Sequence, residues 1–200
     1  MFKIRLTKNE LKRQKDALRM YNRYLPTLIL KKQQLQMEVR KVEERQYKLQ
    51  QAKDLLEENF RSWIAVFGED VGLSEKLIVL EKFSRGIGNI AGVSIPLFEG
   101  AKFAEAEYDL WVMPLWVDKA IEELQRVMLL DLELQVLREQ YSLLFAELRT
   151  TTQRVNLFEK VKIPETKMYI KKISIYLGDQ QTASVVRGKI AKRGLEKALR

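Results

Sequence analysis

The chain has 200 residues but no cysteine and no histidine. These absences exclude disulfides, thiolate nucleophiles, imidazole metal ligands and every catalytic triad that uses those side chains. Carboxylates remain, but they fall on predicted helix faces, where a solvated surface is the favoured interpretation. Only nine glycines are present, and none belongs to a phosphate-binding loop, because no Gly-Lys-Ser or Gly-Lys-Thr follows a strand. We therefore expect no catalytic site, no cofactor and no metal.

Long apolar runs are missing too. Hydrophobic residues make up 46% of the chain, yet no window approaches the roughly 18 uninterrupted apolar residues of a membrane helix. Residues 1–6 are followed at once by polar and charged heptads, so the apolar core of a signal peptide is lacking. We expect a cytosolic protein, or one that is attached to a membrane only through its partners.

Two stretches, one near each end, repeat apolar residues every seven positions. In the first, 13 of 18 positions are apolar: Thr7, Leu11, Gln14, Leu18, Tyr21, Leu25, Leu28, Lys32, Leu35, Val39, Val42, Gln46, Leu49, Lys53, Leu56, Phe60, Trp63 and Phe67. In the second, 9 of 11 are apolar, with a continuation after a shift: Val127, Leu130, Leu134, Leu137, Tyr141, Leu144, Leu148, Thr151, Val155, Phe158 and Lys162, then Ile170, Ile173 and Leu177. Such a repeat is typical of a coiled-coil seam with a left-handed supercoil.

The two arms have matching lengths. Positions 7–67 make 61 residues and positions 114–177 make 64, which is about 90 to 100 Å of helix each. Pairing within one chain is therefore predicted, with an intermolecular homodimer or a coiled-coil tether as alternatives. The expected fold is mostly α: a long antiparallel left-handed coiled-coil hairpin of N- and C-terminal helices with a small middle region. We divide it into an N-terminal arm (1–70), a middle region (71–113) and a C-terminal arm with a basic tail (114–200).

The middle region reads as extended chain. β-branching and alternation at Val93, Ile95 and Leu97 predict a strand, and 89–92 is a predicted turn, so a short β-hairpin is expected. Further expectations concern its borders: a short amphipathic helix over 74–83, a return towards helix over 101–108, and Pro114 in the first turn of the C-terminal arm. Within the arms, Pro26 predicts a bend near residues 22–26, and Pro164 lies where the second seam changes register.

The net charge of +9 conceals a division along the chain. Residues 1–50 hold 14 lysines and arginines against 5 acidic residues, and residues 151–200 hold 12 against 4. The middle hundred hold 10 against 18. Pairing of the arms brings the basic quarters together at the free end, which suits nucleic acid, an anionic membrane or an acidic protein cavity. Nucleic acid is disfavoured because exposed aromatics do not alternate with the basic residues, and a membrane because the seam already uses the apolar stripe.

Three segments carry a resemblance to a known family. They are Leu11–Leu18 with Leu28–Glu38, Asn89–Pro96, and Gln153–Ile170, whose Arg-Val-Asn, Ile-Pro and Tyr-Ile elements are the most specific. The chain resembles the D subunits that form the central rotor shaft of V-type and archaeal-type (V/A) ATPases and ATP synthases, in their prokaryotic form. It departs from the family at Tyr24, Pro26 and Gln33, and in the stretch 178–184.

The resemblance implies a protein without a catalytic site that transmits torque between the catalytic ring and the membrane rotor, coupling ATP synthesis to proton or sodium transport. Implied partners are the catalytic and non-catalytic ring subunits, the small accessory F subunit of the central stalk, and the socket subunit (C or d) above the membrane rotor ring. The implied location is peripheral, on the cytoplasmic face of the membrane, with no nucleic acid and no direct membrane insertion. A non-enzymatic coiled-coil scaffold or tether is the alternative.

Charge and the resemblance together indicate two sets of residues. The candidates for contact with the ring are Lys8, Lys12, Arg13, Lys15, Arg19, Lys171, Lys172, Arg187, Lys189, Lys192 and Arg193. The candidates for a coupling element in the middle region are Asn89, Ile90, Gly92, Val93, Ile95, Pro96 and Phe98. A purely local packing role is the alternative for the second set.

Overall fold

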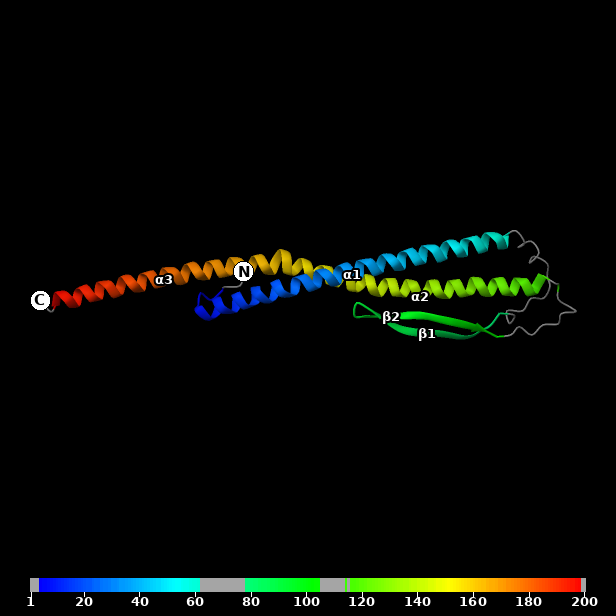
Figure 1. The fold of residues 1–200 in the computed structure, drawn as a ribbon, viewed down its shortest axis with the longest axis horizontal. Coiled ribbons are helices and arrows are strands. Elements are labelled where there is room, and N and C mark those ends of the chain that lie inside the picture. The colour runs from blue at the N-terminus through cyan, green and yellow to red at the C-terminus, as the bar shows by residue number, and fades with distance from the viewer. Residues whose placement is uncertain (1–3, 62–77, 105–113, 115, 199–200) are drawn as a thin grey trace. The chain divides into compact units, whose positions relative to one another are not determined.

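The computed structural model describes residues 4–61, 78–104, 114 and 116–198 (Figure 1). Its elements are α1 (Lys8–Arg61), β1 (Leu80–Ile90), β2 (Val93–Phe103), α2 (Trp116–Asn156), the π-helix η3 (Leu157–Lys162) and α3 (Ile163–Ala198). The expectation of a mostly α fold with a two-stranded hairpin between long terminal helices is confirmed. The predicted seam positions Trp63 and Phe67, and the predicted helical stretches 74–77 and 105–108, lie outside the described residues.

The chain divides into two compact units, which we describe in turn. Unit 1 comprises Met1–Lys31 and Thr150–Arg200, and unit 2 comprises Lys32–Arg149. Each unit contains one stretch of α1 and one stretch of the helical C-terminal half of the chain. The predicted seam is thus represented in both.

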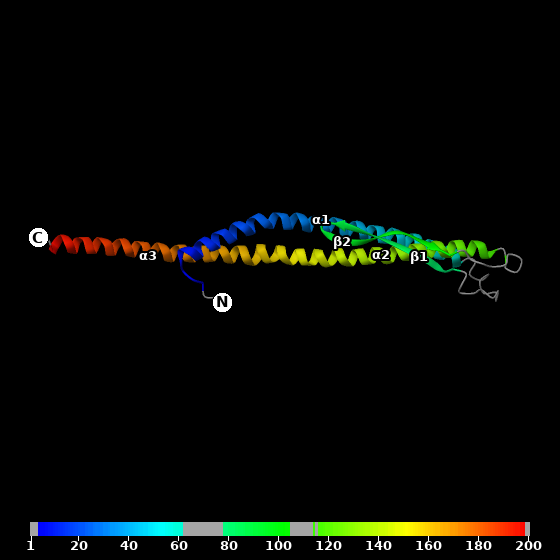
Figure 2. The ribbon, with the colours of Figure 1, turned by 90° about the horizontal axis from the view of Figure 1, so that it is seen from below.

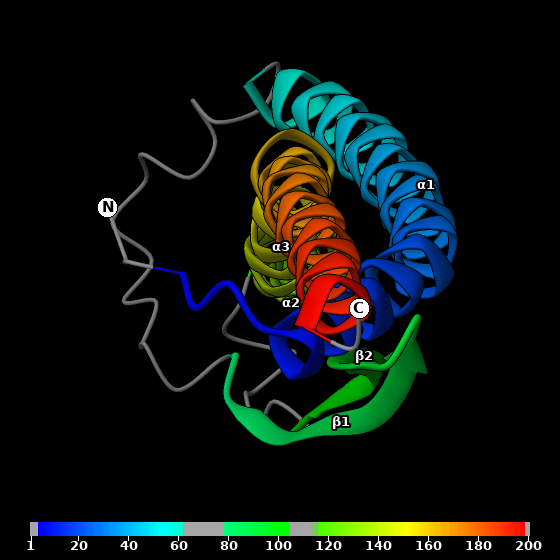
Figure 3. The same ribbon diagram turned by 90° about the vertical axis from the view of Figure 1, so that its left-hand side faces the viewer.

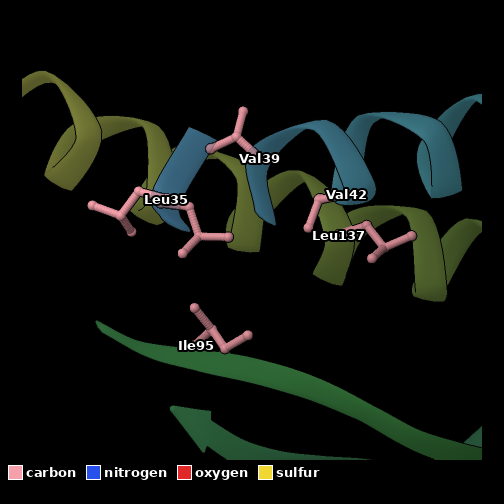
Figure 4. Packing of buried hydrophobic residues seen from close by; sticks show 6 residues of the cluster. Leu35, Val39, Val42, Ile95 and Leu137 are labelled. Carbon is pink, nitrogen blue, oxygen red and sulfur yellow. The ribbon is translucent and has the colours of Figure 1, made fainter. Parts of the chain in front are cut away.

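The core of unit 2 joins three elements. The α1 residues Leu35, Val39 and Val42 meet the α2 residues Leu137 and Leu144, and β2 adds the buried Ile95 (Figure 4). These helix positions all belong to the predicted seams. Arg45 of α1 meets Glu133 of α2, and Lys53, further along α1, meets the earlier Asp131, as an antiparallel pair requires.

Two ion pairs lie across this helix pair. Arg45 donates to Glu133 at 2.7 Å, and Lys53 donates to Asp131 at 2.6 Å and approaches Glu57 at 3.3 Å. Lys53 is therefore a charged seam position with its own partners. The hydrogen bond to Asp131 raises the pKa of Lys53 above its ordinary value, against a smaller opposing effect of burial.

The middle region of unit 2 is one antiparallel hairpin. Ile90 pairs with Val93 across a two-residue turn in which Ala91 and Gly92 have φ angles of 52° and 81°. This is the type I′ geometry that matches the twist of a hairpin, and the twist is plain in Figure 3. The Asn89 side-chain oxygen accepts the Gly92 N–H at 3.0 Å. The predicted strand and turn are confirmed.

The borders of the hairpin correct two predictions. Residues 80–83, expected in an amphipathic helix, belong to β1, and residues 101–103, expected to return to helix, belong to β2. The reason is their mutual pairing, in which Leu80 lies opposite Phe103.

Pro114 precedes α2 by two residues, and its carbonyl accepts the Val117 N–H at 3.1 Å. Pro114 therefore lies at the entrance of the helix and not in its first turn.

Unit 1 pairs the first part of α1 with η3, α3 and the end of α2. The rings of Tyr21 and Phe158, both predicted seam residues, lie 5.2 Å apart. The seam of the C-terminal partner is buried at Thr151, Val155, Ile163, Thr166 and Ile173. α1 starts with a hydrogen bond from the Glu10 N–H to the Thr7 hydroxyl and continues through Pro26 as one helix, without a break in its ribbon (Figure 2). The bend at Pro26 stays a prediction.

A π-helix accounts for the predicted shift of register. In η3 the Ile163 N–H donates to the Phe158 carbonyl, five residues earlier. One wide turn of this kind inserts one residue into the helical repeat. The seam positions accordingly move on by one residue, from Val155 and Phe158 before the π-helix to Ile163 and Thr166 after it. Pro164 follows directly; because it cannot donate to the carbonyl four residues back and clashes with it, the wider turn relieves a conflict.

Replacing Leu144 by Ala should lower the free energy of unfolding by about 2 to 5 kcal/mol, because Leu144 is fully buried in the cluster that joins α1, α2 and β2. Urea unfolding followed by circular dichroism measures the change. The matched control is Leu55→Ala, whose side chain is mostly exposed on α1, and which should change stability by less than about 0.5 kcal/mol. Equal effects of the two substitutions would contradict a core at Leu144.

Candidate interaction surfaces

The hairpin is held on α2 by three different kinds of contact. Ile95 is 2% exposed within the core cluster. Next to it, the Gln140 side-chain amide donates to the Pro96 carbonyl at 2.5 Å, and Gln140 is itself buried. The Arg85 guanidinium donates to the Glu139 carboxylate at 3.3 Å. An apolar anchor, a buried hydrogen bond and an exposed ion pair thus fix the hairpin in one position on the helix.

Pro96 is placed where a proline does no harm. It pairs with Ile87 in the ladder. Hydrogen-bonded and non-hydrogen-bonded pairs alternate along an antiparallel hairpin, starting from the hydrogen-bonded pair at the turn. The Ile87–Pro96 pair is a non-hydrogen-bonded one, so it needs no N–H from residue 96. The Pro96 carbonyl points out of the ladder and meets Gln140. One carbonyl at the edge of the hairpin is therefore satisfied by a side chain of α2.

The coupling candidates divide by their place in the hairpin. Ile90 and Val93 pack against the core cluster, Ile95 lies within it, and Asn89 and Gly92 build the turn. Two remain: Pro96, whose carbonyl accepts from Gln140, and Phe98, whose ring lies 6.1 Å from that of Phe83. The geometry gives all seven a packing or turn role within the unit.

Sequence reasoning missed the most exposed apolar side chain of the hairpin. Ile87 is 86% exposed, between Gly86 and Gly88. The sequence does carry a signal for Ile87, because a large apolar residue between two glycines stands out in the alternation of the strand. Gln140 was also missed, because heptad counting assigns it to a flank of the seam and not to a contact with a strand. Ile87 is thus an apolar side chain on the face of the hairpin that is turned away from the core cluster.

The ring-contact candidates all lie in unit 1 and are all exposed. Unit 1 contains 21 lysines and arginines against 6 acidic residues, a net charge of +15, whereas unit 2 contains 15 against 21, a net charge of −6. The ion pairs of the candidates are long and lie within one helix: Arg13 to Glu10 at 3.7 Å, Arg19 to Asp16 at 4.0 Å and Lys192 to Glu196 at 3.9 Å. Such exposed pairs contribute little to stability, and their acidic partners are already included in the net charge of unit 1.

The last part of α3 is not covered by any described residue of unit 1. Every residue described in 178–196 is exposed, and the red end of the helix continues alone in Figures 1 and 2. Arg187, Lys189, Lys192 and Arg193 lie on this stretch and contribute four positive charges. Because no other element packs there, these charges do not stabilise the helix pair.

Within the described ranges, no three side chains of the metal-binding types gather closely enough to hold an ion. The helices of the described part of the chain also include none that is long and apolar enough to cross a membrane.

The exposed charged helix faces and the docked hairpin are typical of one class of protein, the helical components of larger assemblies. Comparison with known proteins narrows this class. The family of ATP synthase D subunits matches residues 10–193. The chain is 52% identical to the V-type ATP synthase D subunit of Borreliella burgdorferi over 98% of this chain and 97% of that protein. It is 35% identical to that of Chlamydia trachomatis and 33% identical to that of Chlamydia muridarum, each over 96% of both chains. The chain belongs to the family of ATP synthase D subunits.

Replacing Gln140 by Ala should loosen the hairpin while leaving the helices paired. The substitution removes the donor to Pro96, a loss of about 1 kcal/mol, so hydrogen exchange of the hairpin amides should become about five- to tenfold faster. The control is Gln135→Ala, an exposed glutamine on the same helix, which should change nothing. Exchange measured by NMR or mass spectrometry would contradict the docking if both variants matched the unchanged protein.

Proposed function

We propose that this chain is the central-stalk rotor component of a V-type ATP synthase, transmitting torque between the ATP-hydrolysing or ATP-synthesising ring and the membrane rotor. It contributes no catalytic site of its own. ATP synthesis or hydrolysis is thereby coupled to transport of protons or sodium ions. In that complex the chain lies at the cytoplasmic face of the membrane, with the ring subunits, the accessory F subunit and the socket subunit (C or d) as its partners.

The observation that carries the proposal is the division of charge between two helical units with continuous seams. A seam of buried apolar side chains, each contributing about 1.5 to 3 kcal/mol when fully buried, resists twisting because every turn of one helix is locked to the other. Exposed lysines and arginines attract an acidic cavity over a long range without a rigid contact that must break at each step. Unit 1 is thus suited to rotate within a ring.

A coiled-coil scaffold is the alternative, and it is compatible with the seams alone. The feature it does not explain is the +15 charge of unit 1, which a tether does not need. Co-purification separates the two functions, because the rotor component should be recovered with ATPase ring subunits and the scaffold should not.

Reversing Arg187, Lys189, Lys192 and Arg193 to Glu should leave helix content unchanged, because residues 178–196 lack packing partners. Binding to the catalytic ring should fall by more than about tenfold at low ionic strength, where the Debye length is about 30 Å, and less at physiological salt, where it is about 8 Å. Interferometry with the purified ring measures the affinity.

The control for this reversal changes four exposed basic residues of unit 2 to Glu: Arg40, Lys48, Arg138 and Arg149. This variant introduces the same charge difference outside unit 1 and should retain ring binding. If the two variants bind the ring equally well at low salt, unit 1 is not the ring-facing part of the chain.

Replacing Ile87 by Asp tests the hairpin as a coupling element. Because Ile87 is 86% exposed, the hairpin should stay docked, whereas removal of residues 89–96 would also remove Ile95 from the core. In the reconstituted complex we expect ion pumping per ATP hydrolysed to fall by at least about twofold, as a surface contact worth roughly 1 kcal/mol is lost. The control is Ser94→Asp on the same hairpin. Unchanged ratios in both variants would limit the hairpin to a packing role.

A further inference from the structure

The pairing of helices in unit 1 is interrupted at one level. Between Val155 and Ile163 the C-terminal partner of α1 buries no side chain, and the whole of η3 lies in this stretch. The rings of Tyr21 and Phe158 meet there, 5.2 Å apart and tilted by 45°, and both are only partly buried. A coiled-coil seam is locked by side chains that are held in holes of the facing helix. With no buried side chain, the partner of α1 is joined to it less tightly at this level.

Each helix also lacks a main-chain hydrogen bond close to this ring pair. Pro26 follows Tyr21 by five residues, and Pro164 follows Phe158 by six. Proline has no N–H, so neither residue can donate to a carbonyl of the preceding turn. Two weakened turns, one in each helix, are therefore close to the same contact.

Side-chain hydroxyls compete for carbonyls in the same two places. The Thr27 hydroxyl donates to the Tyr24 carbonyl at 2.8 Å, and the Thr166 hydroxyl donates to the Lys162 carbonyl at 2.6 Å. Side-chain bonds to the backbone of the preceding turn offer it an alternative to the helix, and they often bend helices. Both helices are thus weakened by threonine side chains as well as by prolines.

We call residues 21–27 and 157–166 the weakened segments. Along both helices they lie between unit 2 and the candidates for ring contact. Unit 2 comprises Lys32–Arg149, and the candidates fall within 8–19 and 171–193. Torque that is carried along the chain between unit 2 and these candidates therefore passes through the weakened segments.

We propose that the weakened segments form a torsional joint, a place where the helix pair twists under load more than it does along the continuous seam. The extra residue of η3 creates the joint, because it separates the seam before it from the seam after it. Pro164 fixes its position, because an α-helical turn there would bring the proline ring against the Lys160 carbonyl. Twist is therefore taken up at one defined level. The inference rests on the proposed rotor function, in which the ring and the membrane rotor act on different parts of one chain.

Single-molecule measurements on the assembled complex test the joint. The ring is fixed to a surface, and a bead is attached to unit 2 through Lys48→Cys, an exposed position in a chain without other cysteines, which is biotinylated before assembly. In a complex stalled without nucleotide, thermal motion spreads the angle of the bead. The variance of this angle is inversely proportional to the torsional stiffness between ring and bead, so a softer joint gives a wider spread.

Removing the extra residue should stiffen the chain. The variant lacks Glu159 and carries Pro164→Ala, so that Val155, Ile163 and Thr166 return to steps of seven and three residues and η3 becomes part of a continuous α-helix. The angular variance should fall about twofold, since the former joint then twists no more than the helices beside it. Pro164→Ala alone is the matched control. It keeps the extra residue, so the variance should stay as wide as in the unchanged protein.

A pair of glycine substitutions tests the opposite direction and does not depend on the folding of the deletion variant. Lys160 in η3 and Lys167 in α3 are both exposed, and replacing either by Gly removes one charge and leaves the buried seam intact. Lys160→Gly should widen the angular variance about twofold, because Gly adds backbone freedom where the seam does not restrain the helix. Lys167→Gly, where the seam has resumed, should leave the variance unchanged.

Hydrogen exchange of the full chain provides a readout that does not need the ring. The amides of residues 157–166 should exchange about fivefold more slowly in the deletion variant than in Pro164→Ala, because restored α-helical hydrogen bonds protect them. Equal exchange in the two variants would contradict the weakness of η3.

The outcomes separate the joint from the rotor function. Equal angular variance in the deletion variant and its control, or equal effects of the two glycines, would overturn the joint in a complex whose rotor still turns. If no variant associates with the ring, and neither does the unchanged protein, the rotor function fails. Slower exchange in the deletion variant would then leave η3 as a weak point of a helix pair that carries no torque.

Discussion

The interlocking of apolar side chains between antiparallel helices is the constraint on which the other features depend. Leu35 and Leu144 are fully buried, so their contact is desolvated from all sides. The same cluster receives Ile95. The hairpin thus has no core of its own, and two strands alone are at best marginally stable in water. It is folded because the seam provides a surface on which it packs, and any function of the hairpin is inherited from the helix pair beneath it.

Electrostatic interactions destabilise the packed helices of unit 1 and stabilise those of unit 2. A net charge of +15 on one compact unit raises the free energy of the folded state by self-repulsion. The apolar seam offsets this cost, because its contribution does not depend on charge. In unit 2, opposite charges meet across the helices, as between Arg45 and Glu133. Like charges are thus gathered in unit 1, whereas opposite charges are paired in unit 2.

Periodicity in the sequence predicted the helices, the seam positions and the shift of register, because a helix that buries one face needs apolar residues at a fixed spacing. Periodicity could not reveal that a π-helix causes the shift, since apolar spacing records which residues face a partner and not which carbonyl an N–H meets. The strand ends at residues 80–83 and 101–103 were missed for a related reason. Their pairing is specified by contact between distant residues, while each segment alone has helical spacing. Gln140 escaped notice because its hydrogen bond to Pro96 exists only when the hairpin meets α2.

Polar groups within the seam explain how two repetitive helices find one alignment. An apolar heptad repeat tolerates a slip by seven residues with little loss of buried area. In such a slipped pairing, Lys53 would lose Asp131 and would keep only Glu57 of its own helix, so the pairing in the correct register is favoured by one ion pair between the helices. Among the described residues, Gln46 Nε2 and Thr151 Oγ1 are buried without a hydrogen-bond partner, at a cost of about 1 to 3 kcal/mol each. One such group lies in each unit. Polar residues at single seam positions fix the register of a coiled coil at the expense of its stability. Lys53, Gln46 and Thr151 have this effect in a seam that apolar spacing alone leaves free to slip.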